Sequence, residues 1–389
     1  MVEILGSSKT VSDAYRAAEA EFGHTVSHGH MRVLFSRDFG KPPSHYLNRD
    51  ENSADELLLL KRKLESTNRR IKELEKESSN TALIKSLLGR LDTGAEVEEW
   101  AAPSPKTVNH GTPTLFLSDL HHGEVVRPGE VELANEFNSE ISRQRIRRVF
   151  ERTCSLLNDT FAEPDWPEII VAVGGDILSG NIHEEIRGTN DQPIFDALVD
   201  VAMCLASGLK MLADVFGKVR VPWVVGNHGR IDKKPRYKAA VEDNYEYMLA
   251  HYLGSLLSDD DRIRVEVSDS FSISYKVHNT RYLLTHGDGF RGGSGISGPI
   301  LPWTLGDHRL RKQRQAIDRY KELETSYDVL LFGHWHQYFP TPGFIANGSL
   351  KGFDEFAYKR GFAFQRPQQA LWITHPERGP TFHMPVFGD

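Results

Sequence analysis

The stretch Thr114-Leu-Phe-Leu-Ser-Asp-Leu-His-His-Gly123 joins a short apolar run to a cluster of aspartate and histidine. The run has strand length and is followed closely by glycine, which is typical of a buried strand that ends in a loop. Four later runs have the same form: Ile169–Val173 before Gly174-Gly-Asp176, Val219–Val225 before Gly226-Asn-His228, Arg281–Leu284 before Thr285-His-Gly-Asp288, and Val329–Phe332 before Gly333-His-Trp-His336. Ligands gather at the carboxyl ends of strands in a largely parallel sheet. Five such ends therefore predict one crevice that holds Asp, His and Asn side chains.

Helical stretches separate these strands, at 131–160, 192–216, 236–258 and 308–325. Strands that alternate with helices indicate an α/β fold. We therefore predict a catalytic domain over residues 113–389. It follows a linker over 93–112, where Pro103, Pro105 and an acidic run at 96–99 interrupt the periodic pattern.

Residues 1–50 are predicted to form a small all-α unit. Thr10 or Ser12 can cap a helix that ends at Gly23, and Ser27 can cap a second helix over 28–35. Two helices joined by a short turn have the helix-turn-helix outline, which favours binding of DNA or of a protein partner. A helical hairpin that only packs is the alternative, because the unit has no excess of basic over acidic residues.

Residues 51–92 are predicted to be a helical segment with a short coiled coil. Leu57, Leu60, Leu64, Ile71 and Leu74 follow heptad spacing within residues 55–78, and Lys and Glu crowd the flanking positions. This pattern favours a homo-oligomer joined through 55–78. A single amphipathic helix lying on the catalytic domain would have the same composition.

Bulk composition is that of an ordinary globular protein, with 389 residues and a formal net charge of −7. Two cysteines, Cys154 and Cys204, are too few for a disulfide framework, so a reducing compartment is expected. The sequence shows neither a signal-peptide pattern nor an apolar run of the ~20 residues that span a bilayer. We expect a cytoplasmic protein that does not bind membranes.

The mixture of carboxylate, amide and imidazole at the five strand ends suits a pair of divalent ions. A phosphoester resists hydrolysis because its anionic oxygens repel a nucleophile. Two ions about 3.5–4 Å apart neutralise that charge and activate the water that attacks phosphorus. Such ions take hard or borderline ligands, and the five clusters contain no thiolate.

These clusters, in this order, resemble the calcineurin-like metallophosphoesterase superfamily over roughly residues 113–340. The resemblance implies an αββα sandwich of two sheets, whose second sheet residues 341–389 would help to complete. It also implies that Asp119, His121 and His336 hold one metal, that Asn227, His286 and His334 hold the other, and that Asp176 bridges them. Mn²⁺ is the ion expected, with Fe, Zn or Mg as alternatives. A weaker resemblance is to nucleases of phage and prophage genomes.

Three further residues are candidates for catalysis. The resemblance places His228 just outside the metals, where it would donate a proton to the leaving oxygen. Many family members follow this histidine with an acidic residue that orients it, but Gly229 occupies that position here. Arg230 could clamp a phosphate, and His183 could reach the substrate together with Asn181. Ordinary surface or loop roles are the alternatives for these last residues.

Basic residues adjoin the predicted site in three groups, at 230–238, at 309–321 and at 143–148. A positive potential beside a phosphoesterase centre suits a nucleic-acid backbone, although solvated helical faces are the usual fate of such runs. The favoured function is a two-metal phosphodiesterase that acts as a DNA nuclease. The alternatives are a phosphomonoesterase for phosphoprotein or a small nucleotide, and a non-enzymatic DNA-binding protein.

Overall fold

The computed structural model describes residues 10–22, 60–69, 72, 111–161, 166–291 and 300–389. The chain divides into two compact units, Met1–Pro105 and Lys106–Asp389. In the first unit, helix α2 covers Val11–Phe22. The Thr10 hydroxyl accepts a hydrogen bond from the Asp13 amide at 3.2 Å, so Thr10 caps this helix.

The rest of the predicted N-terminal architecture lies mostly outside the described residues. The second helix of the helix-turn-helix-like unit and nearly all of the linker fall there. Residues 60–69 are helical, and Leu64 on this helix is 53% exposed. The coiled coil, self-association through 55–78 and the boundaries of the four segments stay predictions.

The first sheet of the larger unit has six strands in the order β11-β10-β1-β2-β3-β4. Strands β1 to β4 run parallel to one another, and β10 pairs antiparallel with β1. Their bounds are Thr112–Leu117 for β1, Ile169–Val173 for β2, Val219–Trp223 for β3, Ile263–Val267 for β4, Gln368–His375 for β10 and Gly379–Phe387 for β11. Parallel β1, β2 and β3 bring three of the predicted ligand loops to one edge.

The second sheet has five strands in the order β5-β6-β7-β9-β8, and β6, β7 and β9 are parallel. Their bounds are Ser272–Val277 for β5, Thr280–Thr285 for β6, Val329–Phe332 for β7, Phe339–Pro340 for β8 and Phe344–Ala346 for β9. The expectation for residues 341–389 is partly wrong, because β10 and β11 join the first sheet. Side chains of β10 alternate: Leu371 and Ile373 pack toward the helices, while Ala370 and Trp372 pack between the sheets.

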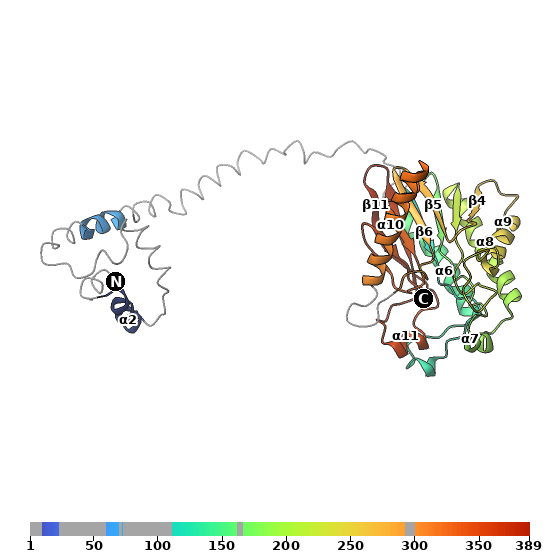
Figure 1. Cartoon of the computed structure of the whole chain (residues 1–389), viewed down its shortest axis with the longest axis horizontal. Helices are drawn as coiled ribbons and strands as arrows, with labels where there is room; N and C mark the ends of the chain where they lie inside the picture. The colour runs from blue at the N-terminus through green and yellow to red at the C-terminus, as the bar shows by residue number, and fades with distance from the viewer. Residues whose placement is uncertain (1–9, 23–59, 70–71, 73–110, 162–165, 292–299) are drawn as a thin grey trace. The chain divides into compact units, whose positions relative to one another are not determined.

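Helices cover the outer faces of both sheets (Figure 1). Three long helices pack with the core of the first sheet, namely α6 (Ser139–Asp159), α8 (Ile194–Phe216) and α9 (Tyr245–Leu256). Helix α10 (Ile300–Lys321) buries Trp303 against Phe332 and Phe344 of the second sheet. The predicted αββα arrangement of this unit is therefore confirmed. Three short elements complete it, the 3-10 turn η4 (Pro128–Glu130), α7 (Glu184–Thr189) and α11 (Glu355–Arg360).

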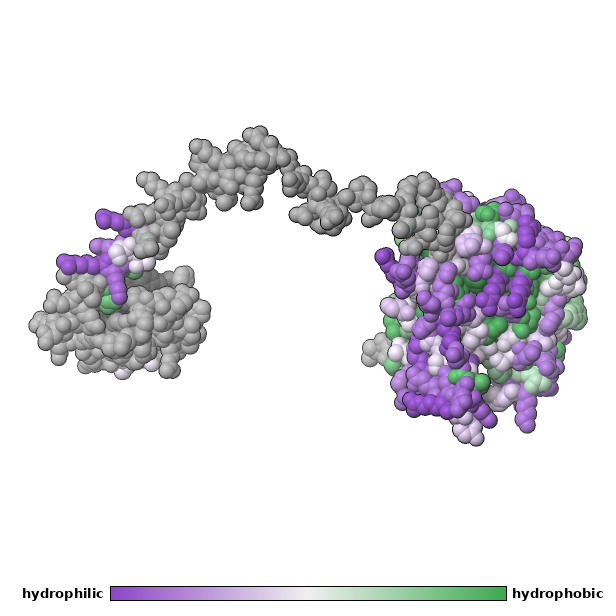
Figure 2. All heavy atoms as spheres, turned by 90° about the horizontal axis from the view of Figure 1, so that it is seen from above, coloured by the Kyte–Doolittle hydropathy of each residue, from purple (hydrophilic) through white to green (hydrophobic). Residues whose placement is uncertain are grey.

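Large apolar side chains fill the space between the two sheets. Phe116 and Trp372 of the first sheet pack with Tyr282 and Leu331 of the second, and all four are fully buried. The face of this unit drawn in Figure 2 is mainly hydrophilic, with small hydrophobic patches. No helix among the described residues is long and apolar enough to cross a bilayer.

Candidate metal centre

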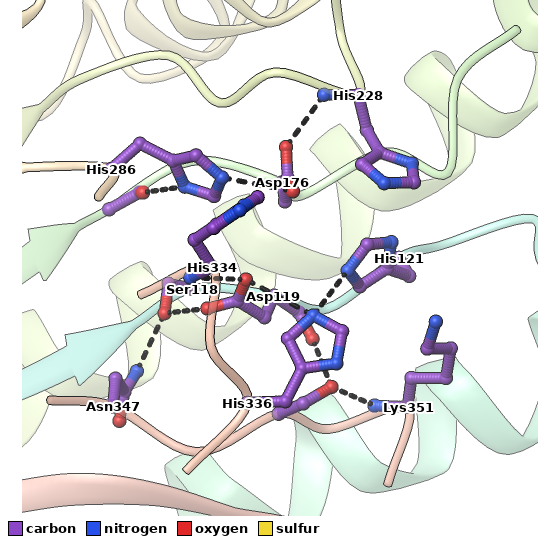
Figure 3. A network of polar contacts seen from close by, with 12 residues as sticks. Ser118, Asp119, His121, Asp176, His228, His286, His334, His336, Asn347 and Lys351 are labelled. Atoms are coloured by element: carbon purple, nitrogen blue, oxygen red, sulfur yellow. Dashed lines mark hydrogen bonds and ion pairs between the residues drawn. The ribbon is translucent and has the colours of Figure 1, made fainter. Parts of the chain in front are cut away.

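The loops after β1, β2, β3, β6 and β7 bring their polar side chains together (Figure 3). The first group consists of Asp119, His121 and His336, which offer ligand atoms within 4.8 Å of one another. The Nε2 atoms of His121 and His336 face each other at 3.0 Å, and His336 Nε2 lies 3.4 Å from Asp119 Oδ1. These are the three residues predicted to hold the first metal.

The second group consists of Asp176, His286 and His334. His286 Nε2 lies 3.0 Å from Asp176 Oδ2 and 3.1 Å from the side-chain oxygen of Asn227. A third set, His121, Asp176 and His228, also offers atoms within 4.8 Å of one another, so the first two groups are neighbours. The structure thus brings all seven predicted ligands into one cluster, with Asp176 between the two halves.

The backbone at this cluster is unusual. Eleven non-glycine residues in the described part of the chain have positive φ, and five of them are predicted ligands: Asp119 (54°), His121 (48°), Asp176 (52°), His334 (68°) and His336 (54°). A non-glycine residue in this region costs free energy, and such residues gather at functional sites. Five of these strained residues are predicted ligands whose side chains lie in one cluster, which indicates a functional site.

Two glycines of the motifs let neighbouring loops approach the carboxylates. A Cβ atom on Gly226 would lie 2.1 Å from Asp176 Oδ1, and one on Gly333 would lie 2.2 Å from Asp119 Oδ2. Both distances are far below van der Waals contact, so no side chain fits at either position. The glycine in Gly-Asn-His and in Gly-His-Trp-His is therefore required by close packing against the two aspartates.

Backbone groups fix how the ligand side chains point. The Gly174 carbonyl accepts from His286 Nδ1 at 2.8 Å, which turns Nε2 toward Asp176 and the rest of the second group. The His334 amide donates to Asp119 Oδ1 at 2.8 Å, and the His228 amide donates to Asp176 Oδ1 at 2.8 Å. Each carboxylate is thereby held by the loop that supplies another site residue.

Support also comes from residues 341–389, in which the sequence indicated no chemistry. Asn347 is fully buried and donates to Ser118 Oγ at 3.0 Å, while Ser118 donates to Asp119 Oδ2 at 2.5 Å. Gln369, also fully buried, accepts from the Ser118 amide at 2.8 Å. Amide residues are common in loops and strands, so only their burial beside Asp119 reveals this role.

Glu246 of α9 is a second residue that sequence analysis missed. Its side chain is fully buried and accepts four backbone N–H groups, from Asp176 (3.1 Å), Ile177 (2.5 Å), Leu178 (3.0 Å) and Gly226 (2.7 Å). One carboxylate thus joins the loop after β2 to the loop after β3. Burial, together with the nearby Asp176 charge, raises the pKa of Glu246 to about 7.

A buried lysine lies at the other side of the cluster. Lys351 Nζ is 3.0 Å from Glu124 Oε1 and 2.5 Å from Asp354 Oδ2, and all three residues are less than a tenth exposed. Although burial opposes the ammonium charge, the two carboxylates raise the pKa of Lys351. His121 Nδ1 lies 3.4 Å from Glu124 Oε2, outside hydrogen-bond geometry, and is otherwise buried without a partner among the described residues.

The donor set fits divalent transition ions. Each main group combines one carboxylate with two imidazoles, and neither cysteine belongs to any of the three sets found among the described residues. This mixture suits Mn²⁺, Fe or Zn²⁺. Burial, with the charge of Lys351, lowers the pKa of His121 well below its ordinary value, and burial lowers that of His334 to about 4. Both rings are therefore neutral near pH 7, as coordination requires. The pKa of His286 is shifted the other way: although burial opposes the charge of this ring, the Asp176 carboxylate raises its pKa, so a metal ion would have to displace a proton from it.

The predicted catalytic residues lie at the edge of the cluster. The ring of His228 is 4.6 Å from that of His121 and 5.5 Å from that of His183. Arg230 donates through Nε to the Asn227 carbonyl at 3.0 Å, and its charge helps burial to lower the pKa of His183. The structure thus places His228, His183 and Arg230 near one another, beside the ligand groups.

Several side chains of the three basic groups are bound within the fold, so they are not all available to a nucleic-acid backbone. On α6, Arg143 pairs with Glu140 and Asp200, Arg147 pairs with Glu151, and buried Arg145 donates to the Leu350 and Lys351 carbonyls. On α10, Arg311 is held by Asp307 and three carbonyls. Beside the Asn-His loop, Lys233 and Arg236 are ion-paired, whereas Lys234 and Lys238 make no ion pair with described residues. Five of the fifteen basic residues in these groups are therefore ion-paired with described residues, namely Arg143, Arg147, Lys233, Arg236 and Arg311.

Comparison with known proteins gives distant structural likenesses. No protein-family model and no curated protein matches the sequence. Vps29 of Entamoeba histolytica in complex with Zn²⁺ is 12% identical, with 71% of this chain and 99% of that chain covered and a TM-score of 0.24. Phosphopantetheinyl hydrolase PptH of Mycobacterium tuberculosis is 12% identical (62% and 91% covered, TM-score 0.26), and a putative 5′-nucleotidase of Staphylococcus aureus is 10% identical (72% and 55%, 0.26). Values this low carry no argument about activity, metal or substrate.

Proposed function

We propose that this chain is a two-metal phosphodiesterase of the calcineurin-like type that cleaves DNA. One observation carries the proposal. The two ligand groups, Asp119-His121-His336 and Asp176-His286-His334, share a boundary at which His121 and Asp176 offer atoms within 4.8 Å of each other. Two separate metal sites would not need this adjacency, whereas a pair of ions acting on one phosphate does.

The ions that these groups would hold would neutralise the phosphate oxygens and lower the pKa of a water molecule. The chain's own residues supply the remaining steps. His228 donates a proton to the leaving oxygen, because its ring lies beside both ligand groups without belonging to the predicted ligands. Arg230 and His183 bind a phosphate oxygen from the same side, and Arg230 has no carboxylate partner among the described residues.

The missing acidic residue at position 229 does not leave His228 without orientation. Its Nδ1 atom lies 2.8 Å from the Ser179 carbonyl, which fixes the ring and assigns the proton to Nδ1. Nε2 is then the atom that faces the substrate, and the doubly protonated ring gives its Nε2 proton to the leaving oxygen while Nδ1 keeps its own.

A diester of DNA is favoured over a monoester by the surface beside the Asn-His loop. Lys234 and Lys238 are exposed and make no ion pair with described residues, and between them Tyr237 is 82% exposed. Unpaired cations interleaved with an exposed aromatic ring suit a nucleic-acid strand. The ion pairs of Arg143, Arg147 and Arg311 lower the positive potential of the other two basic groups, and this observation favours the alternative, a phosphomonoesterase for a small substrate.

The test uses the full-length protein, freed of metal and then given Mn²⁺. Hydrolysis of a simple phosphodiester, a simple monoester, and labelled single- and double-stranded DNA is compared for the wild type and Asp176→Ala. Cleavage of the diester and of DNA by the wild type alone supports the proposal. Turnover of the monoester alone assigns the alternative function. If both ions bind and no substrate is turned over, the chain is not a phosphoesterase.

A further inference from the structure

A hollow adjoins the metal centre on the side of helix α11. His334 and His336 line it, together with Trp335, which stands between them in the chain. Phe353, Phe356 and Phe362, from α11 and the residues around it, form an aromatic wall. Whatever occupies this hollow therefore touches two predicted metal ligands and several aromatic rings at once.

Aromatic side chains at this place are exposed to a degree that packing does not explain. Phe356 is 59% exposed and Phe362 is 41% exposed, and their rings contact each other at 5.7 Å and 83°. Burying a phenylalanine stabilises a protein by about 1.5–3 kcal/mol, so exposed rings that adjoin a site indicate recognition. These two rings are available to a ligand next to the predicted metals.

The hollow is held rigidly to the metal centre. Asp354 caps α11 by accepting from the Ala357 amide at 2.8 Å, and its other oxygen binds Lys351. Lys351 in turn binds Glu124, which lies beside His121. Because all three charged groups are buried, the aromatic wall keeps its position relative to the ligand cluster. A flexible surface helix would not offer that precision.

The end of helix α11 carries cations that suit a polyanion. Lys359 and Arg360 lie at the end of α11, are exposed, and make no ion pair with described residues. The guanidinium of Arg360 lies 5.5 Å from the centre of the Phe356 ring. An aromatic platform with adjacent unpaired cations is the arrangement that binds the base and backbone of single-stranded nucleic acid.

We propose that the exposed rings at the mouth of this hollow, Phe356 and Phe362, are a stacking subsite for the nucleobase next to the scissile phosphate. This inference rests on the proposed function. It assigns the substrate class as a strand whose bases are unstacked, because a base in a duplex cannot stack on these rings without leaving its pair. Single-stranded DNA is therefore cleaved faster than a duplex of the same sequence.

The experiment compares two single-stranded oligonucleotides on the full-length, Mn²⁺-loaded protein. One has normal bases, and the other has abasic residues on both sides of a single cleavable phosphodiester. We expect kcat/KM to favour the normal strand at least tenfold in the wild type, as base stacking on an aromatic ring predicts. Phe356→Ala and Phe362→Ala should each shrink this ratio several-fold, mainly through KM, and Phe356→Tyr should restore it.

Phe364→Ala is the matched control, because Phe364 is 56% exposed nearby but does not line the hollow. A kcat/KM ratio of normal to abasic strand that is the same in Phe364→Ala as in the wild type supports the subsite. If the wild type shows no preference between the strands, or if Phe356→Ala and Phe362→Ala keep the wild-type ratio, the subsite is overturned and the proposed function stands.

Equilibrium binding separates failure of the subsite from failure of the proposed function. The affinity of the same two strands for the wild type and for Phe356→Ala is measured by fluorescence anisotropy. If neither strand is cleaved by the wild type, the proposed function has failed. A base-dependent affinity that Phe356→Ala removes would still support the subsite in that case, and equal affinities for the two strands would overturn it.

Discussion

Glu246 fills the space beside Gly229: a Cβ atom on the glycine would lie 2.7 Å from Cγ of the glutamate and 2.2 Å from Oδ1 of Asn244. The position directly after the Asn-His pair is thus closed to any side chain. A carboxylate from α9 is nevertheless present at that place. It supports the backbone of two ligand loops, while the Ser179 carbonyl orients His228.

Loss of the Glu246 carboxylate should loosen both loops. Glu246→Ala leaves four buried N–H groups without their acceptor, each costing about 1–3 kcal/mol unless water enters, so we expect a loss of at least about 3 kcal/mol in unfolding free energy. Glu246→Gln keeps one accepting oxygen and should lose less. Denaturant melts of the metal-free proteins measure this. The exposed Glu242→Ala is the control, and equal stability of Glu246→Ala and this control would contradict the role.

A side chain at position 229 should destabilise the protein, because Asn244 and Glu246 already occupy the space that it would need. Gly229→Ala forces Asn244 or Glu246 to move, and overpacking of this kind costs about 1–3 kcal/mol. Gly188→Ala is the matched control, because a Cβ atom there meets no atom within 4 Å. Thermal melts of the two variants should therefore separate by several degrees, with Gly229→Ala the less stable. A Gly229→Ala variant as stable as wild type would contradict this prediction and show that the start of α9 shifts at little cost in free energy.

The position of Asp176 between the ligand groups predicts how metal content responds to mutation. We expect two Mn²⁺ ions per wild-type chain, measured by metal analysis after gel filtration. Asp176→Asn should weaken both sites, and Asp119→Asn should weaken chiefly the one formed with His121 and His336. Asp232→Asn, on the Asn-His loop but outside every ligand group, should keep both ions. Equal loss from the two aspartate variants would argue against a bridging Asp176.

His228 should affect turnover more than metal binding. Proton transfer by a positioned side chain contributes about 10²–10⁴-fold, so His228→Asn should lower kcat by about that factor while both metal ions remain bound. The exposed His308→Asn variant serves as the control. A His228→Asn enzyme that loses metal instead of rate would place this residue among the ligands.

The strand-end motifs predicted an α/β fold and one crevice for the ligand residues because each motif is local, whereas the αββα sandwich was an expectation from the resemblance. A strand, a glycine and a ligand follow one another in the chain, and parallel pairing then brings the ends together. The supporting residues have no such signal. Glu246 looks like an ordinary acidic residue at a helix start, and Lys351 looks like a surface lysine. Their roles arise only from burial against loops that are distant in sequence, which no single motif encodes.

The buried ion cluster around Lys351 predicts a dependence of stability on acid. Burial of the Asp354 carboxyl opposes its ionisation, but the Lys351 ammonium outweighs this and lowers the pKa of Asp354 to about 2 from an ordinary 3.8. A folded-state pKa below the unfolded value stabilises the protein above pH ~4, and this contribution is lost as the pH falls toward 2. At about 1.4 kcal/mol per pKa unit, the contribution is about 2 kcal/mol. Asp354→Asn keeps an oxygen to cap α11 but cannot ionise. The difference in unfolding free energy between wild type and this variant should therefore shrink by about 2 kcal/mol between pH 5 and pH 2, and a constant difference would show that Asp354 acts only as a cap.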